Sequence, residues 1–172
     1  SRFRGIGRYS LSLALAMARN AGEHEIWLAL SAAFPQSILD LRHAFSDLIP
    51  QERIRVFSIP QPTAEVDPAN GWRARAAEII REEFIESINP DVIHVHSLFE
   101  GYGDDAVVSV GVSKNNGWKT AVTLYDLIPL LDQNSYLSNS VIRKYYFRKI
   151  ESIKRAGLLL AISESSRTEA IN

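Results

Sequence analysis

The chain has 172 residues, 46% of them hydrophobic and 23% charged, with a formal net charge of −1 and no cysteine. This length and composition allow a sizeable buried core within one domain. The lack of cysteine excludes disulfides and thiolate metal ligands. The near-zero charge gives no overall attraction to nucleic acid, so we expect no nucleic-acid partner.

The sequence carries no sign of a membrane span or a secretion signal. No apolar run approaches the roughly 20 residues that cross a bilayer. Arg2, Arg4 and Arg8 lead into an amphipathic helix, without the small-residue cleavage site of a signal peptide. We therefore expect a cytoplasmic protein, with at most a peripheral contact to the inner face of the membrane.

Helical and extended patterns alternate along the whole chain. Expected helices cover 11–19, 35–45, 72–88, 104–115 and 138–156, with a last helix capped by Ser163; expected strands cover 25–30, 53–59, 92–95, 119–124 and 158–162, with a turn at 116–117. Strands separated by helices predict an α/β fold, a doubly wound and Rossmann-like parallel sheet, over one domain, 1–172. We expect 92–96 near the centre of this sheet, and 158–162 buried within it.

The front of the chain departs from the usual order of such a sheet. A glycine turn before the first helix normally follows a strand, yet only four residues precede Gly5. We therefore expect the first strand to lie outside this sequence, and the last helix to be cut short at Asn172. The first helix itself should be largely buried, because its apolar positions form a wide stripe: Leu11, Leu13, Ala14, Leu15, Met17 and Ala18.

The segment 89–101 holds two histidines in and after a short apolar strand. Alternation places His94 and His96 on the same face of that strand. For His94, in mid-strand, we expect a core histidine satisfied by one hydrogen bond. His96 falls at the carboxyl end, where open α/β sheets bind ligands. With Ser97 and Glu100 close behind it, His96 is a candidate site residue.

Gly5 and Gly7 flank one residue immediately before the first helix. Such a loop can place backbone amides and a helix N-terminus against an anion. A plain tight turn explains the same pattern, and both interpretations stay open at this point.

Two helices carry many charges. Glu78 and Glu86 lie in the helix 72–88, where we expect a solvated charged face opposite an inward stripe made of Ala77, Ile80, Phe84 and Ile88. The helix 138–156 carries six cations beside an apolar stripe: Arg143, Lys144, Arg148, Lys149, Lys154 and Arg155 against Ile142, Tyr146, Ile150 and Ile153. These cations form either an ordinary solvated face or a basic patch, 143–155, that makes a weak contact with anionic membrane or a phosphorylated acceptor.

Four motifs occur in order over nearly the whole chain: Gly-Ile-Gly-Arg-Tyr at 5–9, Pro-Asp-Val-Ile-His-Val-His-Ser at 90–97, Thr-Leu-Tyr-Asp-Leu-Ile-Pro at 123–129 and Ala-Ile-Ser-Glu-Ser-Ser-Arg at 161–167. Each motif alone is weak. Together they resemble the N-terminal, acceptor-side domain of the retaining glycosyltransferases of group 1, or family 4, which have the GT-B architecture.

This resemblance implies an enzyme of two Rossmann-like domains with its active site in the cleft between them. Gly5 and Gly7 would approach the phosphates of a nucleotide-sugar donor, while His96, Ser97 and Glu100 would line the acceptor pocket. The donor-binding C-terminal domain, with its paired glutamates, is absent from the sequence. The 172 residues alone are therefore expected to transfer no sugar.

The resemblance also implies the reaction. A hexosyl group would pass from a nucleotide sugar to a glycan or lipid-linked acceptor with retention, in cell-surface polysaccharide biosynthesis, and no metal or other cofactor is expected. Family members often carry a histidine before the aspartate at 126, where this chain has Tyr125. A tyrosine with a pKa near 10 cannot titrate near neutrality as histidine does. His96, Tyr125 and Asp126 are the candidate catalytic residues, with Asp126 placed to orient a sugar hydroxyl.

Two other classes of function remain open. The first is another nucleotide or dinucleotide enzyme on a Rossmann-like sheet, which the lack of a Gly-x-Gly-x-x-Gly or P-loop motif disfavours. The second is a non-catalytic α/β module that binds a nucleotide or another ligand.

Overall fold

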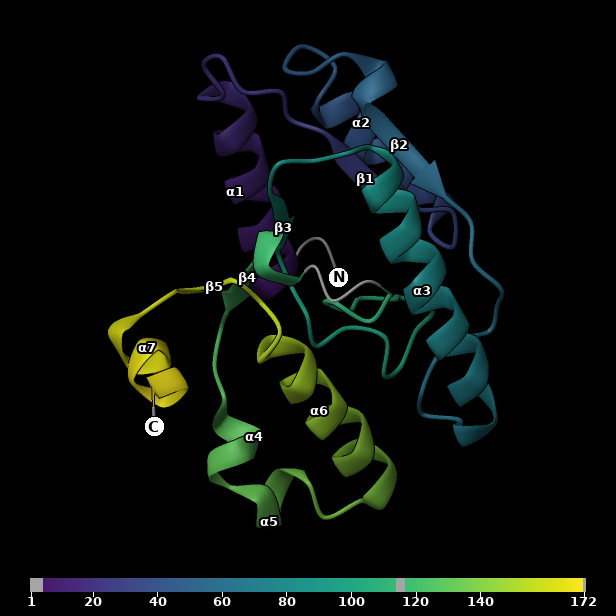
Figure 1. Cartoon of the computed structure of the whole chain (residues 1–172), viewed down its shortest axis with the longest axis vertical. Helices are drawn as coiled ribbons and strands as arrows, with labels where there is room; N and C mark the ends of the chain where they lie inside the picture. Colours follow the sequence, from purple (N-terminus) through teal and green to yellow (C-terminus); the bar gives the residue numbers. More distant parts are fainter. Residues whose placement is uncertain (1–4, 114–116, 172) are drawn as a thin grey trace. The chain divides into compact units, whose positions relative to one another are not determined.

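A computed structural model describes residues 5–113 and 117–171 of the chain. Contacts group the chain into two compact units, Ser1–Ile59 and Pro60–Asn172. Each unit holds its own parallel sheet, flanked by helices (Figure 1). The predicted α/β fold with parallel strands is confirmed, whereas the single domain over 1–172 stays a prediction.

The first unit contains α1 (Gly5–Arg19), β1 (Leu28–Ser31), α2 (Pro35–Ala44), a 3-10 turn at Gln51–Arg53 and β2 (Ile54–Phe57). Strands β1 and β2 pair in parallel, from Leu28 opposite Ile54 to Ser31 opposite Phe57. The helices pack on this pair through a small core of Ala18, Phe45, Ile49 and Ile54.

The first helix differs from the sequence prediction in two ways. Gly5 and Gly7 do not form a loop, because α1 already begins at Gly5. In every helix the N–H groups of the first turn lack an intrahelical partner. Starting α1 at glycine residues therefore costs few hydrogen bonds. Within α1 only Ala18 is buried, and Met17 is exposed. The expectation of a largely buried helix is therefore wrong for the described chain, although Leu11 and Leu15 pack partly against the core.

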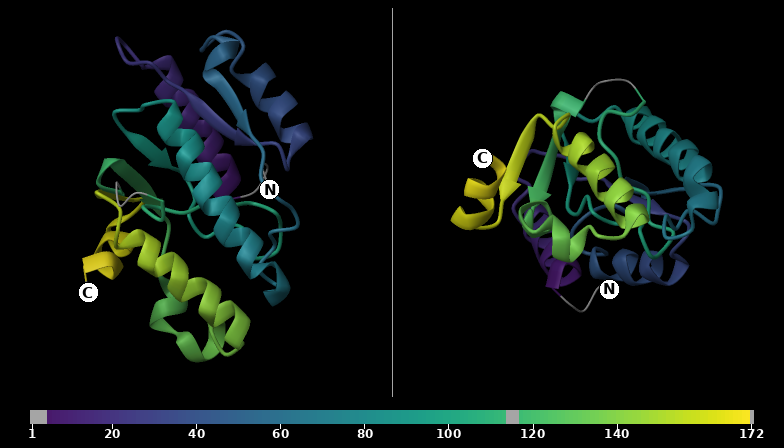
Figure 2. Two further views of the ribbon diagram at one scale, coloured as in Figure 1. Left: turned by 45° about the vertical axis from the view of Figure 1, so that its right-hand side comes forward. Right: turned by 90° about the horizontal axis from the view of Figure 1, so that it is seen from below.

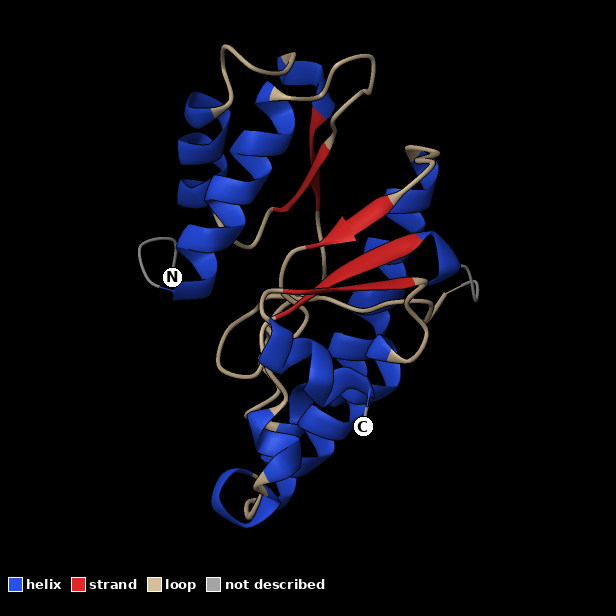
Figure 3. Cartoon of the chain, turned by 90° about the vertical axis from the view of Figure 1, so that its left-hand side faces the viewer, coloured by secondary structure: helices blue, strands red, loops and turns tan. Residues whose placement is uncertain are grey.

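The second unit contains α3 (Gly71–Ser87), β3 (Ile93–Val95), β4 (Thr120–Leu124), α4 (Ile128–Leu131), α5 (Gln133–Tyr136), α6 (Ser140–Ile153), β5 (Leu158–Ala161) and α7 (Glu164–Ile171), with 3-10 turns at Pro68–Asn70 and Gly117–Lys119. Its three strands run parallel in the order β3-β4-β5, and Figure 3 shows them side by side in red. Of the predicted turn at 116–117, Asn116 lies outside the described residues.

The sheet of the second unit is centred on β4 rather than on 92–96. All five residues of β4 are buried, and β3 lies at one edge of this sheet. The sequence predicts that the strand 158–162 is buried, and this is wrong for one face of the strand. Leu158 and Leu160 on that face are 55% and 40% exposed. An edge strand has only one neighbouring strand, so apolar sequence alone does not enclose it.

Helix α6 packs on the sheet through the predicted stripe. Tyr146, Ile150 and Ile153 are buried in the main core, and Ile142 packs against it. The rest of this core includes Val95, Leu98, Val110, Val122, Leu124, Leu127, Leu137 and Tyr145. The stripe prediction is confirmed.

The helix predicted over 104–115 is not formed in its described part, 104–113, which is irregular. Asp105 does not cap a helix there. Its Oδ1 instead accepts hydrogen bonds from the backbone N–H groups of Thr63, at 2.6 Å, and Ala64, at 3.1 Å. This carboxylate, in the first turn of the predicted helix, is thus bonded to a loop about 40 residues earlier in the chain.

The acidic face of α3 points inward, so the expectation of a solvated face is wrong. Glu78 is 2% exposed and forms ion pairs with Arg75 and Arg148. Glu82 is 8% exposed and accepts hydrogen bonds from the Ser109 hydroxyl and the backbone N–H groups at 112 and 113. Buried carboxylates persist only when paired or hydrogen-bonded, and both conditions are met here.

The expected inward stripe of α3 is rotated as a result. Ile80 is exposed, and Phe84 and Ile88 are half-buried. The buried positions are Ala74, Ala77, Glu78, Glu82 and Ile85. Glu86 is also half-buried, and its Oε1 is closed off from solvent without a hydrogen-bond partner. Apolar periodicity always places glutamates on the outer face of a helix, and the face that it predicts for α3 is therefore the wrong one.

Three of the six cations of the helix predicted over 138–156 form ion pairs or hydrogen bonds within the second unit. Arg148 pairs with Glu65 and Glu78, Lys149 Nζ donates to the Val108 carbonyl, and Arg155 Nε donates to the Val110 carbonyl at 2.7 Å. Figure 2 shows α6 beside α3, which it meets through Arg148. The expectation of a fully solvated basic face is wrong for these three. The exposed cations of the set are Arg143, Lys144 and Lys154.

None of the helices in the described ranges combines the length and the apolar character needed to cross a bilayer.

Gly157 should tolerate no side chain. A Cβ atom there would lie 2.0 Å from the Trp118 carbonyl oxygen, a backbone atom that cannot rotate away. We expect Gly157→Ala to lower the free energy of unfolding by about 1–3 kcal/mol, as overpacking does. Chemical denaturation measures this loss. The control is Gly103→Ala, where an added Cβ meets nothing within 4 Å; equal stability of the two variants would contradict the close approach.

Lys149 should make stability depend on pH. Burial lowers the pKa of its ammonium to about 7, from 10.5 in the unfolded chain. Between pH 7 and 10 the unfolded state therefore binds more protons, and stability rises with pH by up to about 1.4 kcal/mol per unit. Denaturation at pH 7.5, 8.5 and 9.5 should show this rise, and Lys149→Met should flatten it. Lys154→Met, at an exposed position of the same helix, should leave the slope unchanged. An identical slope in the Lys149 variant would refute the assignment.

Candidate functional site

Polar side chains gather where the parallel strands of the second unit end. Since β3, β4 and β5 run parallel, their carboxyl ends meet at one edge of the sheet. The segments that follow them are 96–100, 125–127 and 162–169. These hold five of the seven residues that the sequence singled out for the site, namely His96, Ser97, Glu100, Tyr125 and Asp126.

The segment after β3 is fixed by hydrogen bonds of its own. Ser97 Oγ donates to Glu100 Oε1 at 2.7 Å, so these two candidate residues are paired with each other. The hydroxyl of Tyr145 on α6 donates to the Glu100 carbonyl oxygen at 2.9 Å. Burial raises the pKa of Tyr145, which keeps this hydroxyl protonated as a donor. The Glu100 carboxylate is therefore held at a defined place at the end of β3.

The histidines occupy the positions that alternation predicts. His94 Nε2 lies 2.9 Å from Thr123 Oγ1 on β4, so the predicted single hydrogen bond is confirmed, whereas the residue is half-buried rather than enclosed in the core. The ring of His96 lies against that of His94, with centroids 4.1 Å apart. Burial, and after it the charge of His94, lowers the pKa of His96 to about 4. At neutral pH His96 is therefore an uncharged hydrogen-bonding group.

Helix α7 holds the segment after β4. Ser166 Oγ donates to the Tyr125 carbonyl oxygen, and the Leu127 backbone N–H donates to Glu169 Oε2 at 2.7 Å. Between these two attachments, Asp126 is exposed, and its Oδ1 accepts from the Ile128 N–H at 3.3 Å. The backbone on both sides of Asp126 is fixed while its carboxylate remains open to a ligand.

A buried tyrosine lies close to Asp126. Burial, followed by the charge of Asp126, raises the pKa of Tyr146 on α6 to about 12. Tyr146 is thus a neutral phenol in the core, within the influence of the Asp126 charge, and it cannot act as a base near neutral pH.

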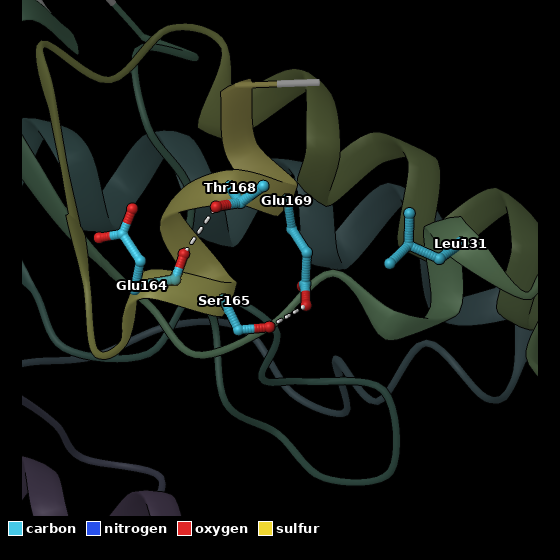
Figure 4. Close-up of a pocket in the computed structure, with 5 residues that line it drawn as sticks. All are labelled: Leu131, Glu164, Ser165, Thr168 and Glu169. Carbon is cyan, nitrogen blue, oxygen red and sulfur yellow. Dashed lines mark hydrogen bonds between the residues drawn. The ribbon is translucent and has the colours of Figure 1, made fainter.

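An open hollow of ≈ 540 Å³ lies between α4 and α7. Figure 4 shows its lining, which consists of Leu131, Glu164, Ser165, Thr168 and Glu169. The carboxylate of Glu169 faces Ser165, whose Oγ donates to Glu169 Oε1 at 3.3 Å. None of the candidate site residues from the sequence lines this hollow. The link is Glu169, which lines the hollow and also holds Leu127, next to Asp126.

Ser166 and Glu169 are the residues that sequence reasoning missed. The predicted cap of the last helix is confirmed, because the Ser166 N–H donates to Ser163 Oγ at 3.1 Å. That cap fixes the first turn of α7 and so presents Ser166 to Tyr125. The only sequence signal for the contact of Ser166 with Tyr125 is that the two residues belong to the motifs at 161–167 and 123–129, and Glu169 lies outside both.

Gly5 and Gly7 belong to the first unit, and their predicted approach to donor phosphates stays a prediction. Over residues 5–113 and 117–171, no three histidine or carboxylate side chains converge in a way that could hold a metal ion.

The comparisons with known proteins found relatives by sequence alone. No family model and no solved structure matches the chain. The chain is similar to a segment of mannosyltransferases. It is 37% identical, over 99% of its length, to a protein of Escherichia coli named serotype-specific mannosyltransferase WbdA. Two further E. coli proteins of that name are 37% and 36% identical over 91% of the chain. The chain spans only about a fifth of the length of these relatives.

The attachment of α7 to Leu127 can be tested directly. Glu169→Ala removes a charge-assisted hydrogen bond, worth about 1.5–3 kcal/mol, so the Leu127 amide should exchange with solvent roughly 10- to 150-fold faster. Amide hydrogen exchange followed by NMR measures this change. Glu164→Ala, at an exposed carboxylate of the same helix whose partner is Arg167, serves as the control. Equal Leu127 exchange rates in the two variants would show that Glu169 does not hold this segment.

Proposed function

We propose that this chain is part of a glycosyltransferase that acts in polysaccharide biosynthesis. The observation that carries the proposal is 37% identity across nearly the whole chain to a protein named as a mannosyltransferase. A parallel sheet with polar residues at its strand ends is compatible with such an enzyme. Because the relatives are named as transferases, the alternative of a non-catalytic binding module is not favoured.

The finer proposal rests on the four sequence motifs. It assigns the chain to the acceptor side of a retaining GT-B enzyme of group 1, or family 4, with a nucleotide sugar as donor and no metal. In this proposal Gly5 and Gly7 approach the donor phosphates, and a separate C-terminal domain binds the rest of the donor. The 172 residues alone would then bind an acceptor without transferring sugar to it.

The charges at the strand ends support an acceptor role for this surface. The described segments 96–100, 125–127 and 162–169 carry the carboxylates of Glu100, Asp126, Glu164 and Glu169. Their one cation is Arg167, which pairs with Glu164 at 2.7 Å. Such a surface repels a diphosphate but offers strong acceptors to sugar hydroxyl groups.

The proposed chemistry follows from these groups. Asp126 accepts a hydrogen bond from a hydroxyl of the reacting sugars and orients it, and uncharged His96 adds a second hydrogen bond. Tyr125 replaces the family's histidine and supplies no titrating group near neutral pH. A departing nucleoside diphosphate would draw its electrostatic stabilisation from groups outside these segments.

The weak contact with anionic membrane, through 143–155, also stays a proposal. It now rests on the three exposed cations, Arg143, Lys144 and Lys154. At about 1 kcal/mol for each cation near an anionic surface, the contact would be weak and sensitive to salt.

The function is tested on the intact protein that carries this chain. A panel of nucleotide sugars, including a mannose donor, is incubated with neutral glycan acceptors, and products are identified by mass spectrometry. We expect Asp126→Ala to lower the rate roughly 5- to 150-fold, from the loss of one hydrogen bond worth about 1–3 kcal/mol, while the protein stays folded.

Asp91→Ala is the matched control. Asp91 is also an exposed aspartate, but it precedes β3 and so lies at the amino end of the strands. Full activity of the Asp126 variant would remove this residue from the site. A lack of any glycoside product from the unaltered protein would refute the proposed function itself.

A further inference from the structure

His94 and His96 contact each other through their rings, and His94 is also hydrogen-bonded to a residue of the next strand, β4. The rings of His94 and His96 lie 4.1 Å apart, with their planes inclined by 34°. His94 Nε2 is bonded to Thr123 Oγ1 at 2.9 Å. Thr123 is buried in β4, the central strand of its sheet. The ring next to His96 is therefore anchored to a strand whose residues are all buried.

His96 itself has an unsatisfied atom. Its Nδ1 is closed off from solvent and has no hydrogen-bond partner. An unpaired buried polar atom is costly, so the ring is not placed there for its own stability. Because Nδ1 is closed off, a ligand of this ring would have to meet Nε2. An imidazolium would put a second N–H on Nδ1 with no acceptor, which favours the neutral ring.

We infer that His94 is a positioning residue for His96. Anchored to Thr123, it supports one face of the His96 ring, so that the ring keeps a single orientation and offers Nε2 to a hydroxyl group of an uncharged acceptor. The identity of that ligand rests on the proposed function, whereas the support of one ring by the other does not.

The charge state of His96 agrees with this role. Burial lowers the pKa of both histidines, and the charge of His94 lowers that of His96 further, to about 4. A neutral imidazole can exchange hydrogen bonds with a hydroxyl group over the whole physiological pH range. It offers no positive charge to a phosphate. The arrangement therefore favours sugar hydroxyl groups over phosphorylated groups at this end of the sheet.

The ring support is tested by NMR titration of the histidines in the 172-residue chain, with the exposed His24 and His43 as reference signals. His94→Phe keeps an aromatic ring but loses the anchor and the charge. His94→Ala loses the ring as well. We expect the pKa of His96 to rise from about 4 in the order wild type, Phe, Ala, toward the unperturbed value near 6.5.

Thr123→Val removes only the anchor and should also shift the His96 titration. Thr120→Val, at another buried threonine of β4, is the matched control and should leave it unchanged. A His96 pKa near 6.5 in the wild type, or one that is the same in all His94 variants, would overturn the inference. If His94→Ala does not fold, the Phe and Thr123 variants carry the test.

The link to the acceptor is measured in the intact protein. His94→Phe and Thr123→Val should raise the acceptor KM about 2- to 12-fold, as expected for one weakened hydrogen bond, and leave the donor KM unchanged. An unchanged acceptor KM alongside a shifted titration would overturn the ligand part of the inference. A protein that transfers no sugar at all would overturn the proposed function, and the NMR titration would still decide the role of His94.

Discussion

Arg148 joins α6 to two segments of the second unit that lie 70 and 83 residues earlier in the sequence. Its guanidinium lies between Glu65, in the loop before α3, and Glu78, on α3 itself. Arg75 approaches the same two carboxylates from the α3 side. Removing one member of such a buried set leaves an uncompensated charge, which is far more costly than never having built the set. The orientation of α3 and α6 in this unit therefore depends on these ion pairs as well as on apolar packing.

Charged side chains also hold the irregular segment 104–113 in position, through hydrogen bonds to its backbone. Carbonyl oxygens at 108 and 110 accept hydrogen bonds from Lys149 and Arg155, and amides at 112 and 113 donate to Glu82. Side chains on α3, on α6 and just after α6 thus satisfy backbone groups which a helix would have satisfied internally. The strand ends are fixed in a similar way from behind. Tyr145 of α6 holds the segment after β3, and Ser166 and Glu169 of α7 hold the segment after β4.

Much of the fold could be predicted because apolar periodicity is a local property. The strand 119–124 and the helices 35–45 and 138–156 appear close to their predicted bounds, and the parallel pairing follows from strands separated by helices. The predictions failed where charged groups turn inward, as with Glu78, Glu82 and Lys149, since a single sequence does not show which distant partner will satisfy a buried charge. The candidate site was predicted in part. The contact between His94 and Thr123 could not be predicted from the sequence, because the register of β3 against β4 is set only by the tertiary structure.

By itself, the sequence determined the class of fold and the residues that follow each strand, because alternation and turn residues act over a few neighbouring positions. It thereby placed His96, Ser97 and Asp126 at strand ends. Only the tertiary structure decided their chemical state. The pKa of His96 falls because burial and a neighbouring ring surround it, and Asp126 stays exposed because α7 holds the backbone around it. Burial, charge and hydrogen-bond partners depend on residues distant in sequence, and these come together only when the chain folds.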